Sequence, residues 1–356
     1  MDLLPDDLLR LVFICLPWPF RMRCRKVCRR WRDAITWRNV PRDKVWRAAV
    51  DACHRGDLGV LQRRVAQFSI TVDEITAHGS HALYMACYGG HLTTVAWLAA
   101  RFGLDAKDVR MRGCRALAAA CGHNHIEFVE WFAAAFKLGA EDARVDDNWI
   151  LRTACEKGHL AMAKLVVATF GLGPDDARAW NNNALSCACR QGHLDVAQWL
   201  VATFGLGSAD VRSCSALSYA CQGGHLVVAK WLVSAFGTVG AGAYIAPDTD
   251  LREICGRGRL NVAEWFVTLF EPGPRRARLR GGIALAAASK NGHLDVVQWV
   301  ADTFGREAGT CPSRVLCQQN TSLCHDWTHW RYRAIARARA CGHSAVVEWL
   351  RGHRLP

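Results

Sequence analysis

Cysteine and histidine recur at fixed positions along this 356-residue chain, and both residue types can bind metals or take part in catalysis. Seven of the 17 cysteines share one spacing: Cys53, Cys87, Cys121, Cys155, Cys189, Cys221 and Cys255. All seven precede by four residues the central residue of a Gly-His-Leu step, or of a variant of it. Because a buried cysteine behaves as a small hydrophobic residue, this regular recurrence favours core packing over a metal or redox ladder.

The histidine of this step could serve either as a catalytic acid or base or as a structural residue. Clear copies centre on His91, His159, His193, His225 and His293, and with the variants at His125 and Arg259 consecutive steps are mostly 34 residues apart. A residue that returns once per unit is better explained by a hydrogen bond to the backbone at a turn between helices. We therefore expect the histidines to be structural.

A third cluster lies near the C-terminus, where the spacing grows from 34 to 50 residues. The candidate zinc ligands there are Cys311, Cys317, Cys324, His325 and His329. No tight Cys-x-x-Cys pair is present, so a plain loop is favoured and no metal site is predicted. The chain also shows no glycine-rich phosphate loop, nucleophile motif or suitably spaced carboxylate pair. We expect neither enzymatic activity nor a cofactor.

The elements that carry these residues form a repeat with a period of about 34 residues, which indicates a solenoid. Within one unit, Val196, Leu200 and Phe204 form a helical stripe after the step, and Leu185 lies on a shorter helix before it. Trp199 and its equivalents are placed in the core by this stripe. The spacing predicts an all-α fold with about nine helix–turn–helix units over residues 46–356.

The net charge of +13 is concentrated at the two ends of the chain. Residues 1–50 contribute about +7 and residues 305–356 about +5, whereas the long middle is nearly neutral. A basic segment at Arg21–Arg32 is better read as a solvated face, so nucleic acid is not expected as a partner. No apolar run is long enough for a membrane helix, and the first residues lack a basic signal-peptide region. We expect reduced cysteines and a cytoplasmic or nuclear location.

The helical half of the unit resembles the ankyrin repeat, with its helix, Gly-His turn and second helix. The hairpin half is degenerate, because sequences such as Asp142-Ala143-Arg144 and Asp210-Val211-Arg212 read as short helical turns more than β-fingers. The resemblance covers most of residues 46–356, with an insert at about 305–330 and a capping unit at about 332–356. Similar degenerate arrays are abundant in large DNA viruses of amoebae, which implies a host-cell location if the source is viral.

Residues 4–35 follow another pattern, a Leu-Pro-acid start and a Val-Cys-Arg-Arg-Trp end. This segment is similar to an F-box, which implies a three-helix domain over residues 1–40 that binds the Skp-type linker subunit of a cullin–RING ubiquitin ligase. Phe20, Arg21 and Met22 depart from the acid and leucines usual in the family. The implied linker-binding residues are Leu4, Pro5, Leu8, Leu9, Val12, Phe13, Leu16, Val27 and Trp31.

The order of F-box and repeats resembles a non-catalytic substrate receptor of an SCF-type ligase, monomeric outside that complex. In ankyrin-like stacks, the residues two and three before each step line the inner helix face, where targets bind. The candidate target-binding residues are Tyr88, His123, Glu156, Lys157, Arg190, Gln191, Gln222, Arg257, Lys290 and Asn291. Two alternatives remain open: a repeat protein that sequesters a host factor without ubiquitination, and a basic nucleic-acid-associated protein.

Overall fold

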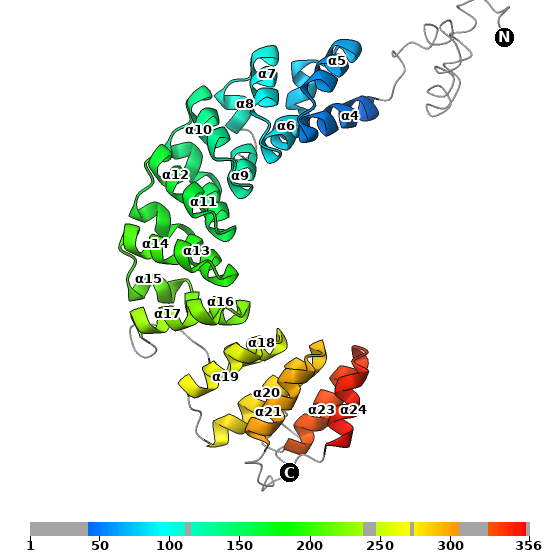
Figure 1. Ribbon diagram of the computed structural model, residues 1–356, viewed down its shortest axis with the longest axis vertical. Coiled ribbons are helices and arrows are strands. Elements are labelled where there is room, and N and C mark those ends of the chain that lie inside the picture. The colour runs from blue at the N-terminus through cyan, green and yellow to red at the C-terminus, as the bar shows by residue number, and fades with distance from the viewer. Residues whose placement is uncertain (1–41, 111–114, 238–246, 271–273, 306–326, 354–356) are drawn as a thin grey trace, which may run out of the picture. The chain divides into compact units, whose positions relative to one another are not determined.

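The computed structural model describes residues 42–110, 115–237, 247–270, 274–305 and 327–353 (Figure 1). Two compact parts, Met1–Ile150 and Leu151–Pro356, are each described by themselves. Every regular element within the described ranges is an α-helix. The predicted all-α class and the nine helix–turn–helix units are confirmed there, whereas the F-box segment, residues 1–40, lies outside the described residues.

Each unit consists of a first helix, the glycine-containing step and a second helix, and some units add a short helix in front. The first part contains α4 (Arg42–Arg55), α5 (Leu58–Phe68), α6 (Val72–Tyr88), α7 (Leu92–Phe102), α8 (Ala106–Arg110), α9 (Arg115–Gly122), α10 (Ile126–Ala135) and the start of α11 (Ala140–Glu156). The second part contains α12 (Leu160–Phe170), α13 (Pro174–Gln191), α14 (Leu194–Phe204), α15 (Ser208–Ser213), α16 (Ala216–Gly223), α17 (Leu226–Phe236), α18 (Pro247–Gly256), α19 (Leu260–Leu269), α20 (Pro274–Asn291), α21 (Leu294–Phe304), α23 (Trp327–Ala340) and α24 (Ser344–Gly352).

The core of a unit follows the predicted stripes. In α14, Val196 and Leu200 are fully buried and Phe204 is nearly so, while Leu185 and Ala188 of α13 are buried against them and against α16. The small residue five positions before the step is buried throughout, which lets successive first helices approach closely. Burying each valine or leucine contributes about 1.5–3 kcal/mol, and a unit completes this burial only against its neighbours.

The tryptophans of the second helices differ from the prediction, because they are half-buried and not part of the core. Trp199 lies at the margin of the stripe that Val196 and Leu200 form, so one side of the indole remains in contact with solvent. Its ring packs edge-on against Phe204, with 5.9 Å between ring centroids. The equivalent pairs in α7, α10, α17 and α21 have the same T-shaped geometry. The tryptophan therefore covers the edge of the core.

The step forms the joint between consecutive units. Gly192 ends α13 in the left-handed region, with φ of 83°, and the ring of His225 from the next unit lies directly over it. A side chain at Gly192 would overlap that ring, so glycine is required by conformation and by contact. The histidine hydrogen-bonds across the joint, as His193 Nε2 donates to the Glu156 carbonyl oxygen at 3.0 Å. The expected backbone partner is confirmed, and it belongs to the preceding unit.

The expected helical turns between units are confirmed as α8, α15 and the first turns of α11 and α13. Each carries an aspartate that caps its own helix. Two of these aspartates, Asp142 and Asp210, also bind an arginine of the preceding unit. Asp210 accepts a hydrogen bond from the Gly207 N–H at 2.9 Å and one from Arg178 Nε at 3.0 Å. Arg110 and Asp142 form the same pair in the first part, at 2.5 and 3.0 Å. The degenerate hairpins therefore link neighbouring units.

The last described unit consists of α23 and α24. Trp327 and Trp330 at the start of α23 are buried, and the ring of Trp330 covers Gly282 of α20 so closely that a side chain there would overlap it. The helix α23 begins at Trp327, near the end of the stretch predicted as an insert. Most of that stretch lies outside the described residues. The proposed boundary of the capping unit, at about residue 332, stays a prediction.

Candidate protein-interaction surface

The candidate target-binding residues all lie at the C-terminal ends of first helices or just after them. We call this strip, together with the exposed side chains one or two turns earlier on the same helices, the first-helix surface. The exposed members are Tyr88, His123, Lys157, Arg190, Gln191, Arg257, Lys290 and Asn291, and the half-buried members are Glu156 and Gln222. None of the ten is used in the core, so all remain candidates for contact with a partner.

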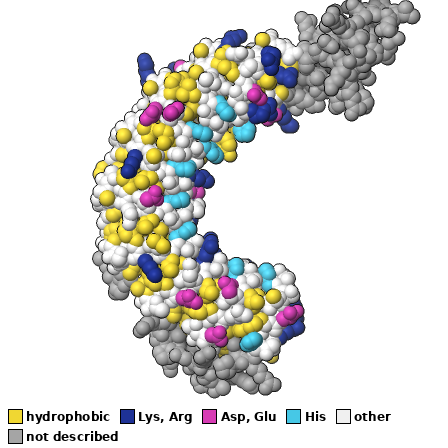
Figure 2. All heavy atoms as spheres, viewed as in Figure 1, with side chains coloured by type: hydrophobic (Ala, Val, Ile, Leu, Met, Phe, Trp, Pro, Cys, Tyr) yellow, Lys and Arg dark blue, Asp and Glu magenta, His cyan; other side chains and the backbone are white. Residues whose placement is uncertain are grey.

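In the first part, the surface contains aromatic rings that lie side by side and tilted against one another. The Tyr88 ring lies 4.0 Å from the ring of His123 and 5.7 Å from that of His54, measured between centroids. The Tyr88 carbonyl oxygen also accepts a hydrogen bond from His125 Nε2 at 3.1 Å. The joint thus fixes the backbone that presents these rings. In each described part, histidine side chains gather along one edge (Figure 2).

In the second part, two candidate residues have partners within the surface. The Arg190 guanidinium lies 5.9 Å from the centre of the Tyr219 ring. Gln222 Nε2 donates to Ser218 Oγ at 2.9 Å and to the buried carboxylate of Asp250 at 3.4 Å. Gln222 is therefore held by a buried acid, whereas Arg190 keeps exposed donors for a partner.

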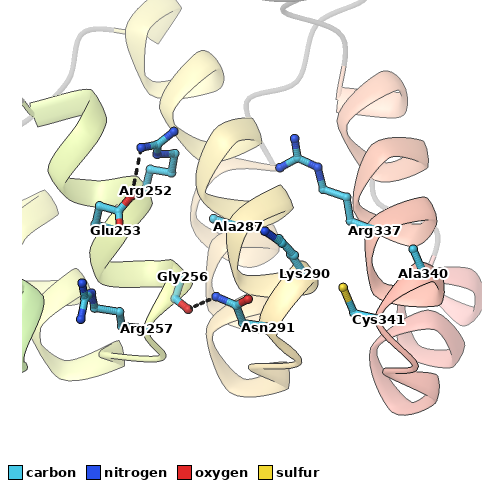
Figure 3. A pocket seen from close by; sticks show the side chains of 10 residues that line it. All are labelled: Arg252, Glu253, Gly256, Arg257, Ala287, Lys290, Asn291, Arg337, Ala340 and Cys341. Atoms are coloured by element: carbon cyan, nitrogen blue, oxygen red, sulfur yellow. Dashed lines mark hydrogen bonds and ion pairs between the residues drawn. The ribbon is translucent and has the colours of Figure 1, made fainter.

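The last three units bring further candidates together around one cavity of about 700 Å³, lined by Arg257, Lys290 and Asn291 (Figure 3). Asn291 Nδ2 donates to the Gly256 carbonyl oxygen at 2.5 Å. Arg252 and Arg337 line the same cavity but were not among the sequence candidates. Both stand six or seven residues before their step, where residue types also vary between units, and this variation is the signal that could have found them.

Trp180 is a second omission from the sequence candidates. It is 58% exposed and adopts a left-handed conformation, with φ of 50°, at the kink within α13. The Arg152 guanidinium stacks on its ring at 4.7 Å. Asn182 supports this strained turn through hydrogen bonds to Asp210 and to Ser213 Oγ. Exposed tryptophan with arginine is a combination enriched at protein interfaces.

The cysteine ladder is confirmed as core packing. The seven repeated cysteines are buried and fully covered by protein. Burial raises the pKa of the Cys53, Cys221 and Cys255 thiols to about 12, so they stay protonated at neutral pH. Within the described chain, no three of His, Cys, Asp and Glu lie close enough to hold a metal ion. Of the zinc candidates, only His329 is described, and its ring lies 6.0 Å from that of Trp330.

The aspartates between units are held as carboxylates. The hydrogen bonds from Arg110 and from the Gly139 N–H lower the pKa of Asp142, against the opposing effect of its burial. Burial also opposes ionisation of Asp210, but the hydrogen bonds from Arg178 and Gly207 outweigh it and lower the pKa. The ion pairs thus remain charged over the neutral range, and they serve structure more than chemistry.

These features define a helical repeat protein whose variable surface suits binding to other proteins. Residues 151–241 match the family of ankyrin repeats, in three copies, and residues 1–43 match the F-box domain. No curated protein matches the chain. The chain thus carries an F-box domain and ankyrin repeats, two kinds of module that mediate protein interactions and are typically non-catalytic.

The predicted linker-binding residues lie outside the described residues, so their roles stay predictions. For the membrane question, the described chain contains no helix that is long and apolar enough to span a bilayer.

Proposed function

We propose that this protein is the substrate-recognition adaptor of an SCF-type cullin–RING ubiquitin ligase. The proposal is carried by the presence of both modules in one chain, an F-box at residues 1–43 and ankyrin repeats behind it. The F-box at residues 1–40 binds the Skp-type linker subunit, and the array at residues 46–356 binds a target. Holding the target near the conjugating enzyme raises the effective concentration of its lysines.

The linker contact is assigned to one apolar helical face of the F-box. Leu8, Val12 and Phe13, together with Leu9 and Leu16, recur at the spacing that makes one broad apolar face of a helix. A segment of about forty residues has too little core of its own to bury such a face. The linker subunit covers it in the assembled ligase.

The target contact is assigned to the first-helix surface. Its exposed arginine and aromatic side chains, such as Arg190 and Tyr219, are residue types that dominate binding energy at interfaces. They project from helices whose packing is fixed by the joints, so the surface is ordered before the target arrives. The adaptor itself supplies binding and no chemical step.

The test replaces Leu8, Val12 and Phe13 together by aspartate in the full chain. Burying these charges in the linker interface should weaken capture of a recombinant Skp-type linker subunit by about 100-fold or more. The matched control changes the same positions to Met, Ile and Leu, which preserves the apolar face and should preserve capture. Linker affinity is measured by titration calorimetry, and other bound host proteins by affinity purification with mass spectrometry.

The expected result is separation of the two activities. The aspartate variant loses the linker and the cullin but still recovers the other host proteins, and ubiquitination of those proteins stops. Failure of the unaltered protein to bind a linker subunit would refute the adaptor function and leave sequestration by the repeats in its place. Loss of both activities in the aspartate variant would show that the F-box is a structural cap on the array.

A further inference from the structure

The cavity of the last three units lies between three successive first helices, α18, α20 and α23 (Figure 3). Its volume of about 700 Å³ falls within the range of ligand-binding clefts, about 300–1,000 Å³. Each helix contributes at least one cationic side chain: Arg252 from α18, Lys290 from α20 and Arg337 from α23, with Arg257 following α18. We call this site the basic groove.

The charges of the basic groove are not balanced by the protein itself. Arg252 forms an ion pair with Glu253 at 2.9 Å, and Glu253 is the one carboxylate that lines the cavity. Arg257, Lys290 and Arg337 are exposed, and none of them forms an ion pair with a described residue. Three positive charges are therefore available to a ligand.

The floor between these cations is made of small side chains. Ala287 lies between Arg252 and Lys290, and Ala340 lines the cavity at its α23 end (Figure 3). Gly256 also belongs to the floor, and its carbonyl oxygen is already bonded to Asn291. Because these side chains are small, the groove has room for the extended backbone of a peptide. The side chains of that peptide can then reach the cationic groups around it. Arginine in particular binds carboxylates through two parallel hydrogen bonds.

We infer that the basic groove binds an acidic segment of the target protein, through its aspartate and glutamate side chains. This inference rests on the proposed function, because it assigns the groove to the target-binding surface. Nucleic acid fits less well, since no aromatic side chain lines the cavity for base stacking. The groove thus selects targets by local negative charge.

The test uses the full chain and a fluorescein-labelled peptide of alternating glutamate and glycine, followed by fluorescence anisotropy. The groove variant changes Arg257, Lys290 and Arg337 to glutamate. The control variant makes the same change of charge at three exposed residues of second helices in other units: Arg63, Lys164 and Lys230. We expect the groove variant to weaken peptide binding by at least about tenfold, and the control variant to change it little.

A glutamine-for-glutamate peptide tests the same contact without altering the protein. It should lose binding to the unaltered chain, and binding of the glutamate peptide should fall as salt rises through about 0.15 M. Equal binding of both peptides, or equal effects of the two protein variants, would overturn the inference. So would binding restricted to a phosphoserine peptide, or stronger binding of single-stranded DNA. These readouts do not involve the linker subunit, so failure here is distinguishable from failure of the adaptor function.

Discussion

Replacing Gly192 by alanine probes the joint between two units. Gly192 has φ of 83°, and an added Cβ would lie 2.6 Å from Cε1 and 2.7 Å from Cγ of His225. These separations are far below an ordinary van der Waals contact, so the ring must move. His225 also hydrogen-bonds to the backbone of Arg190, and a displaced ring would strain that bond.

Two costs of known size add at this position. Holding alanine in the left-handed region costs about 1–2 kcal/mol, and forcing a packed ring to shift costs about 1–3 kcal/mol. We therefore expect Gly192→Ala to lower the free energy of unfolding by about 2–5 kcal/mol.

Gly205 provides the matched control. It ends α14 with φ of 59°, but an added Cβ would meet nothing within 4 Å. Gly205→Ala should therefore cost only the conformational part, about 1–2 kcal/mol. The difference between the two variants isolates the contact with the histidine ring.

Urea unfolding of the full chain, followed by far-ultraviolet circular dichroism, measures both variants. Hydrogen exchange should place the extra opening of Gly192→Ala in α13 and α16. Equal stabilities for the two variants would refute the argument from close approach. In a His225→Ala background, Gly192→Ala should cost no more than Gly205→Ala, and an unchanged excess cost would refute it as well.

Three further predictions concern other contacts. Because Trp199 is half-buried and Leu200 fully buried, Trp199→Ala should cost about half of the ~3–5 kcal/mol of a buried aromatic, and Leu200→Ala about 2–5 kcal/mol, by urea unfolding; a costlier Trp199→Ala would contradict the half-buried placement. Asp210→Ala loses a helix cap as well as the pair with Arg178, so its melting temperature should fall more than that of Arg178→Ala; equal falls would refute the capping role. The pKa of His225 is lowered mainly by burial and further by the nearby Arg259 and His193, although its hydrogen bond to the Arg190 backbone raises it. Its unfolded form binds more protons between the two pKa values, so stability should fall as pH drops below about 6.5, and His225→Asn should make that fall shallower.

The helix pairs could be predicted from the sequence because their apolar periodicity is strong and repeats in every unit. The same periodicity does not predict how far Trp199 is buried. A side chain at the margin of an apolar stripe is buried or exposed according to how much of it the adjacent unit covers. That coverage depends on packing between units, which the spacing within one unit does not contain.

The contacts between units were harder to predict for a related reason. The Arg178–Asp210 pair joins residues 32 positions apart, and the Asp-x-Arg pattern within one unit predicts only a short helical turn. Its signal was nevertheless present, because an aspartate and an arginine two residues apart return in successive units. For the candidate surface, variation at the two positions before each step identifies Arg257 and Lys290, whereas Arg337 stands six residues before its step and depends on the stacking of first helices to join them.

The joint has a consequence for how such an array changes over time. Most units carry a glycine for the unit that follows and, at the next position, a ring or long side chain for the unit before. In one unit Asn124, with φ of 59°, stands in place of the glycine. Even Arg259, which replaces the histidine, lies over Gly224 in the same way. A duplicated unit therefore arrives with both halves of its joints already matched, and a deleted one leaves compatible halves behind. Whole units can be gained or lost by recombination at little cost to folding, and the array can acquire new surfaces faster than point mutation alone would allow.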